Sequence, residues 1–111
     1  MSNTYTPDTW VVIKITNLED GTFCYKVLGG WYGGYCGSDS WQLNSGICAI
    51  TRTDTHYEFE GYSGSIYYCS FSSNRLSLLT AQILEGFIKS SEGRGQIEVL
   101  TREEVSLLTL N

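Results

Sequence analysis

The sequence predicts an α+β protein with an antiparallel β-sheet or partly open barrel of about five strands, followed by one longer and one short helix. Segments rich in β-branched and aromatic residues alternate with turn signals over residues 9–71. Near residue 75, apolar residues change from strand spacing to helical spacing. The chain has 111 residues, of which 41% are apolar and 17% charged, so we predict one globular domain over 1–111.

The β core is predicted over residues 9–71, preceded by a flexible arm at 1–8. Its first two strands are WVVIKI at 10–15 and TFCYKVL at 22–28. An Asp-Gly pair between them is a strong turn signal, so these strands are predicted to form a hairpin.

A second hairpin is predicted from residues 56–62, which alternate ring and polar side chains, and 65–71. Between the hairpins, residues 41–43 and 47–51 are predicted to be strand. Gly46 interrupts this strand, which indicates a bulge or a close backbone approach.

The longer helix is predicted over residues 75–90. Ser73 or Asn74 suits its N-cap, and Gly93 follows its end.

Residues 96–110 are predicted to supply a short strand and the short helix. Thr101 and Glu104 match a capping box, so this helix is expected to begin directly after Thr101. Val105 and Leu108 would lie on its inner face.

The glycine-aromatic loop, residues 28–47, is the most unusual part of the sequence. Glycine lets a backbone approach another group closely, and exposed rings stack on flat ligands, while freed backbone amides hold anions. Arg94, between two glycines, is a candidate phosphate clamp or a solvated loop charge. The residues that we predict to bind a flat polar ligand are Trp31, Tyr32, Tyr35, Asp39, Trp41, Asn44, Ser45 and Arg94. The alternative is an ordered loop whose rings cap the end of the sheet or barrel.

Composition narrows the partners of this protein. A net charge of -5 argues against general nucleic-acid binding, which needs many Lys and Arg side chains. No signal peptide or membrane-spanning run is evident, so we expect a cytoplasmic protein. The four cysteines form no Cys-x-x-Cys pair, and we predict neither a metal nor a cofactor.

Catalysis has little support in the sequence. Asp39, His56 and Glu58 are the only sensible candidates, and no nucleophile motif or phosphate-binding loop accompanies them. We therefore predict a protein that is not an enzyme.

Four stretches, YTPDTWVVIKI, KVLGGWYGGY, SDSWQLNSGI and YEFEGYSGSIYYC, resemble small uncharacterised proteins of tailed bacteriophages, over about residues 4–71. The resemblance implies an accessory protein made in the cytoplasm of an infected bacterium. Phage sponges that sequester cyclic nucleotide-derived immune signals are similar in architecture only, since they also join a β core to C-terminal helices and act as oligomers.

Two functions remain open from the sequence. The first is capture of a flat polar ligand, with a nucleotide as one candidate, through the glycine-aromatic loop. The second is a protein-interaction module, either an acidic inhibitor of a host protein or a minor structural component. A homodimer or higher homo-oligomer is also predicted, because the apolar stripe of the longer helix is wide enough for a core and a partner. That stripe comprises positions 76, 79, 83 and 87 together with 80, 84 and 88.

Overall fold

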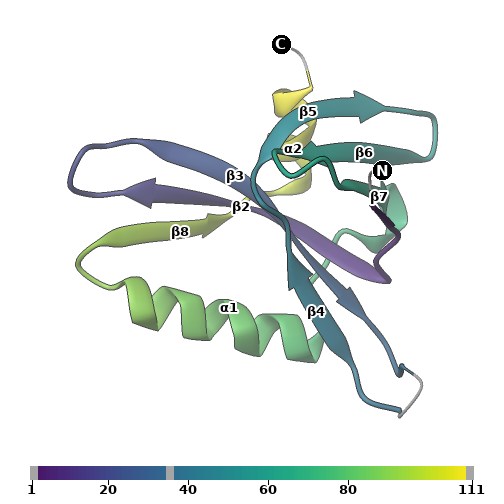
Figure 1. The fold of residues 1–111 in the computed structure, drawn as a ribbon, viewed down its shortest axis with the longest axis horizontal. Helices are drawn as coiled ribbons and strands as arrows, with labels where there is room; N and C mark the ends of the chain where they lie inside the picture. Colours follow the sequence, from purple (N-terminus) through teal and green to yellow (C-terminus); the bar gives the residue numbers. More distant parts are fainter. Residues whose placement is uncertain (1–2, 35–36, 110–111) are drawn as a thin grey trace.

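The computed structural model describes residues 3–34 and 37–109 and has an α+β fold (Figure 1). Within these residues, strands form two four-stranded sheets with pairing orders β1-β7-β6-β5 and β4-β3-β2-β8. The first sheet contains β1 (Thr4–Tyr5), β7 (Ile66–Ser70), β6 (His56–Gly61) and β5 (Ile47–Arg52). The second contains β4 (Ser40–Leu43), β3 (Phe23–Trp31), β2 (Thr9–Asn17) and β8 (Gly95–Val99). The helices are α1 (Leu78–Ser91), α2 (Arg102–Leu108) and one turn of 3-10 helix, η1 (Phe71–Ser73).

The α+β class is confirmed, but the predicted strand count is wrong. The described part of the chain has eight strands in two sheets that do not close into a barrel. The reason lies at Gly46, where the backbone has a φ of +126° and passes from β4 in one sheet to β5 in the other. A Cβ at Gly46 would lie 2.9 Å from the Tyr62 ring, so the predicted close approach is present. The register of β5 against β6 also shifts between Ile47 and Ala49.

The two predicted hairpins are confirmed as β2–β3 and β6–β7. Alternation along β2 places successive side chains on opposite faces of the second sheet. Val11 and Ile13 pack with Leu84 beneath α1, whereas Trp10 and Val12 pack against the first sheet. The β2–β3 hairpin is therefore buried on both faces over much of its length, which explains its content of Val and Ile.

The N-terminal segment differs from the flexible arm predicted for 1–8, because residues from Thr4 onward pack on the β core. β1 pairs in parallel with β7. The Tyr5 ring lies 5.0 Å from the Tyr67 ring, centroid to centroid, and Pro7 is buried. The Tyr5 ring and Pro7 thus supply apolar contacts that hold the N-terminal segment on the β core.

The longer helix begins later than predicted. Ser77 caps α1 in place of Ser73 or Asn74. The Ser77 hydroxyl accepts the Thr80 N–H, and the Thr80 hydroxyl accepts the Ser77 N–H. Residues 71–73 form η1 instead.

The short helix α2 follows the prediction closely. Thr101 and Glu104 form the expected capping box, Val105 is buried, and Leu108 packs partly buried against the core. Gly93, with a φ of +83°, turns the chain between α1 and β8.

Candidate functional site

The glycine-aromatic loop forms the far end of the β3–β4 hairpin. Across this hairpin, Trp31 pairs with Ser40, and Gly30 pairs with Trp41. Paired residues share a face of a sheet, while successive residues alternate. Trp31 and Trp41 therefore lie on opposite faces, and the two indoles cannot enclose one ligand.

Trp41 faces α1. Its ring lies 5.7 Å from the Phe87 ring in an edge-to-face arrangement, and the side chain is 40% exposed. Gly30 shares this face, where a Cβ would lie only 2.8 Å from Thr80 Cγ2. This part of the loop thus allows close packing of α1 on the sheet.

Trp31 faces the N-terminal segment. Its Nε1–H donates to the Thr6 carbonyl at 3.1 Å, and its ring lies edge-on to Tyr5. The side chain of Tyr32 is exposed, and its backbone N–H donates to Asp8.

Asp39 closes the turn of the hairpin by accepting the Gly33 N–H at 2.8 Å. Tyr35, also predicted to bind ligand, lies outside the described residues.

Asn44 and Ser45 stabilise the crossing between the sheets. The buried Asn44 accepts the Val27 N–H through Oδ1 at 2.8 Å and donates its own N–H to the Val27 carbonyl at 3.0 Å. Ser45 Oγ accepts the Ser63 N–H at 2.9 Å. Both side-chain oxygens therefore have partners within the fold, whereas the buried Nδ2 of Asn44 has no hydrogen-bond partner among the described residues.

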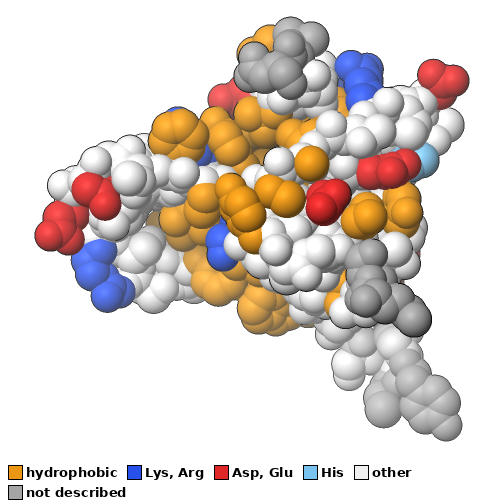
Figure 2. Space-filling model, turned by 45° about the horizontal axis from the view of Figure 1, so that its top comes forward, with side chains coloured by type: hydrophobic (Ala, Val, Ile, Leu, Met, Phe, Trp, Pro, Cys, Tyr) orange, Lys and Arg blue, Asp and Glu red, His pale blue; other side chains and the backbone are white. Residues whose placement is uncertain are grey.

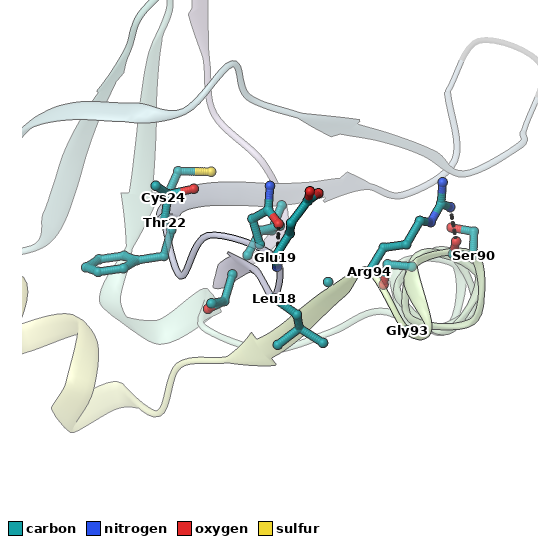
Figure 3. A pocket seen from close by; sticks show the side chains of 13 residues that line it. Leu18, Glu19, Thr22, Cys24, Ser90, Gly93 and Arg94 are labelled. Carbon is teal, nitrogen blue, oxygen red and sulfur yellow. Dashed lines mark hydrogen bonds between the residues drawn. The ribbon is translucent and has the colours of Figure 1, made fainter.

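Arg94 lies in the turn between α1 and β8, away from the other predicted residues; the far ends of β3 and β4 are at the opposite side of the molecule (Figure 1). It borders an open pocket of about 850 Å³, opposite Leu18 and Glu19 in the β2–β3 turn. Figure 3 shows its guanidinium bonded to the Ser90 carbonyl at the end of α1. The predicted ligand residues that the structure describes are thus divided among three places rather than gathered into one site.

A different concavity, which we call the arginine cleft, combines rings with cationic groups. It lies between the first sheet and α2 and has a volume of about 370 Å³. Its lining residues are Trp10, Arg52, Tyr57, Phe71, Asn74, Arg102, Glu103, Val105 and Ser106.

The floor of the arginine cleft is a rigid aromatic cluster. Ring centroids are 5.8 Å apart for Trp10 and Tyr57 and 4.8 Å apart for Tyr57 and Phe71, and both pairs are edge-to-face. The Trp10 Nε1–H donates to the Ser70 carbonyl at 2.7 Å, which fixes the indole. Such buried rings provide a preformed apolar wall.

Two guanidinium groups border this aromatic floor. Arg52, at the end of β5, places its Cζ 5.3 Å from the Phe71 centroid and 5.9 Å from the Tyr57 centroid. Arg102 comes from the first residue of α2. Among the described residues, neither arginine forms an ion pair, while Arg52 Nη1 donates to Ser106 Oγ at 3.4 Å and the acidic Glu103 also borders the cleft.

Sequence reasoning missed the arginine cleft because its two arginines are far apart in the chain. They looked like scattered surface charges, and only the packing of α2 beside β5 and β6 brings them together (Figure 1). The sequence contained only a weak signal for this cleft, namely a Trp and two strands with aromatic residues, together with an Arg at the end of a strand.

The candidate catalytic residues do not converge on this cleft. His56 Nε2 lies 3.1 Å from Glu58 Oε2 on β6, and its Nδ1 lies 3.0 Å from the hydroxyl groups of both Thr53 and Thr55. Asp39 is in the hairpin turn on the other sheet. Over residues 3–34 and 37–109, no group of three or more His, Cys, Asp or Glu is placed to hold a metal ion.

No protein-family model, curated protein or solved structure matched this chain. Neither helix in the described ranges has the length and apolar character needed to cross a bilayer.

Proposed function

We propose that this protein is a non-enzymatic binding protein that captures a flat anionic ligand, with a nucleotide as the representative class, in the arginine cleft. The observation that carries the proposal is the joint lining of one 370 Å³ volume by two guanidinium groups and three aromatic rings. Small-molecule sites typically have volumes of about 300–1,000 Å³ and a mainly apolar lining with a few placed polar groups.

Each part of the cleft has a separate task in this proposal. The Arg52 guanidinium, whose Cζ lies 5.3 Å from the Phe71 centroid, stacks on the ring of the ligand in this proposal. Arg102 neutralises the anionic group of that ligand. Asn74 also lines the cleft, and its Nδ2 donates to the Trp10 carbonyl at 3.3 Å. Its side-chain amide can form hydrogen bonds with polar atoms at the edge of the ligand's ring.

This proposal keeps the ligand class expected from the sequence and moves its site away from the glycine-aromatic loop. Trp31 and Trp41 face opposite ways, and each packs on another part of the fold. The resemblance to phage proteins suggests the setting, an accessory protein acting on a small molecule of the infected cell.

A protein-interaction module is the second candidate, and the apolar surface supports it. Apolar side chains gather across the middle of the face in Figure 2, and Tyr62 is 73% exposed. Such patches often mark contact sites on soluble proteins.

Isothermal titration calorimetry with adenosine monophosphate, adenosine and inorganic phosphate tests the proposed function. We expect the monophosphate to bind more tightly than either fragment, because only it engages both the rings and the cations. Arg52→Gln and Arg102→Gln should each weaken binding by about tenfold or more, the usual effect of losing a charge-assisted hydrogen bond.

Arg94→Gln and Arg75→Gln are the matched controls, since neither residue lines the arginine cleft. Both should bind like the unaltered protein. Equal loss in Arg94→Gln, or no heat with a panel of purine and pyrimidine nucleotides, would overturn the assignment.

A further inference from the structure

The outer edge of β8 leaves backbone groups directed away from its sheet. Among the residues that the structure describes, β8 has β2 as its single partner strand, in a regular antiparallel register. At its two ends, the Leu100 N–H donates to the Val12 carbonyl and the Leu18 N–H donates to the Arg94 carbonyl. Because backbone groups alternate in direction along a strand, even-numbered residues bond to β2. Gly95, Ile97 and Val99 therefore direct their N–H and C=O groups outward.

Other sheet edges are less suited to pairing, within the residues that the structure describes. β5 carries a register shift between Ile47 and Ala49, and β1 and β4 have only two and four residues. Bulges and short length are the usual means of blocking edge-to-edge association. β8 has the sequence GQIEV, with five residues, no proline, no lysine and no register shift.

We propose that β8 pairs with β8 of a second copy of this chain, antiparallel about a two-fold axis at Ile97, so that two β4-β3-β2-β8 sheets become continuous. In this arrangement the outward groups of Ile97 meet those of its counterpart, and Gly95 meets Val99 of the second copy. This interface is separate from the arginine cleft and goes beyond ligand binding.

Side-chain charges support this register. A two-fold axis at Ile97 places Gln96 opposite Glu98 of the second copy, so no carboxylates face each other. A shift of the axis to Glu98 would pair the outward groups of Ile97 and Val99, but it would also place the two Glu98 carboxylates directly opposite each other. The register centred on Ile97 therefore matches the outward backbone groups and avoids opposed carboxylates.

Apolar side chains beside the edge add a second layer of contact. Val99 is 39% exposed, and it pairs with Ile13, which packs beneath α1. Ile88, one turn after the buried Leu84 on α1, is 41% exposed. A two-fold axis perpendicular to the sheet brings both α1 helices to the same face, so the exposed Ile88 and Val99 side chains of both copies lie on that face, with Val99 opposite Gly95 of the other copy. The dimer that the apolar stripe of the longer helix predicts would thus form mainly through β8, with additional apolar contact from α1.

Sedimentation velocity over a range of protein concentrations tests this dimer with paired charge variants. Gln96→Glu introduces a carboxylate opposite Glu98 of the second copy at both symmetric positions, and we expect about tenfold weaker dimerisation. Gln96→Lys supplies the opposite charge and should strengthen the dimer by a similar factor. Neither change removes a backbone bond to β2.

Val99→Pro tests the backbone pairing, because its N–H points outward and proline is tolerated at such edge positions. We expect it to be monomeric, whereas Val99→Thr should remain dimeric. If Val99→Pro fails to fold, the opposite effects expected of Gln96→Glu and Gln96→Lys on dimerisation still test the proposal. A monomer at every concentration, or a dimer that responds to neither Gln96 variant, would overturn the proposal.

Discussion

Trp31 and Trp41 lie on opposite faces of the β3–β4 hairpin because Trp41 pairs with Gly30 and not with Trp31. Each indole packs on a different neighbour, Tyr5 for Trp31 and Phe87 for Trp41. The hairpin thus joins the N-terminal segment to one face of the second sheet and α1 to the other. Gly30 and the two indoles serve this packing, and the arginine cleft combines three rings with two guanidinium groups.

Trp41→Ala should lower the free energy of unfolding by about 1–2 kcal/mol, since it removes an aromatic pair and some buried area. Urea unfolding followed by far-UV circular dichroism measures the change. Tyr32→Ala is the control, because that ring is 51% exposed and should contribute little. A Trp41→Ala protein of unchanged stability that no longer bound nucleotide would contradict the packing role.

Gly30→Ala should destabilise the fold by about 1–3 kcal/mol, as expected for overpacking. Its Cβ would lie 2.8 Å from Thr80 Cγ2 and 2.9 Å from Thr9 Oγ1. The matched control is Gly86→Ala within α1, where a Cβ meets nothing within 4 Å. That change should stabilise by about 0.5–1 kcal/mol through helix propensity. Thermal melts of the two variants should therefore shift in opposite directions.

Asn44→Ala should cost about 1–3 kcal/mol, because it leaves the buried Val27 N–H without its acceptor. Asn44→Asp keeps an acceptor oxygen at the same place but buries a carboxylate, so its stability should rise as the pH is lowered and that carboxylate becomes protonated. Chemical denaturation of both variants separates the hydrogen bond from simple loss of volume. If alanine were as stable as the parent, Asn44 would have no part in holding the crossing between the sheets.

Alkaline pH should destabilise the protein through Tyr67. Burial, and then the nearby Tyr5, raise the pKa of Tyr67 to about 12 from 10.0. Because the folded-state pKa is above the unfolded one, its contribution to stability is complete below pH 10 and declines as the pH rises toward 12. The free energy of unfolding, measured across this range, should fall less steeply in Tyr67→Phe. Identical slopes in the two proteins would show that Tyr67 titrates normally.

Local signals were sufficient to predict much of the fold. The Asp-Gly turn predicts the β2–β3 hairpin, and the Thr101–Glu104 capping box predicts the start of α2, because both depend on residues close together in the chain. The passage of the chain between sheets at Gly46 was harder, since a glycine in a strand signals an irregularity without saying where the next strand pairs. The α1 cap moved to Ser77 because a buried reciprocal bond with Thr80 prevails over earlier polar residues.

The candidate site depended almost entirely on long-range packing. The sequence shows that rings are concentrated in the glycine-aromatic loop. Strand register, which the sequence does not show, decides which face of the sheet each ring occupies. Arg52 and Arg102 share a cleft only because α2 packs beside the β5–β6 edge region, and no local pattern connects them. Arg94, chosen from its glycine neighbours, instead bonds to the end of its own helix.

The most direct test of the arginine cleft is an NMR titration of the three indole N–H signals with adenosine monophosphate. Trp10 reports on the cleft floor, whereas Trp31 and Trp41 report on the two faces of the β3–β4 hairpin. Single Trp→Phe variants assign the signals. We predict that the Trp10 signal shifts with saturation while the other two stay in place. A shift confined to Trp31 or Trp41 would place the ligand at the glycine-aromatic loop and contradict binding in the arginine cleft.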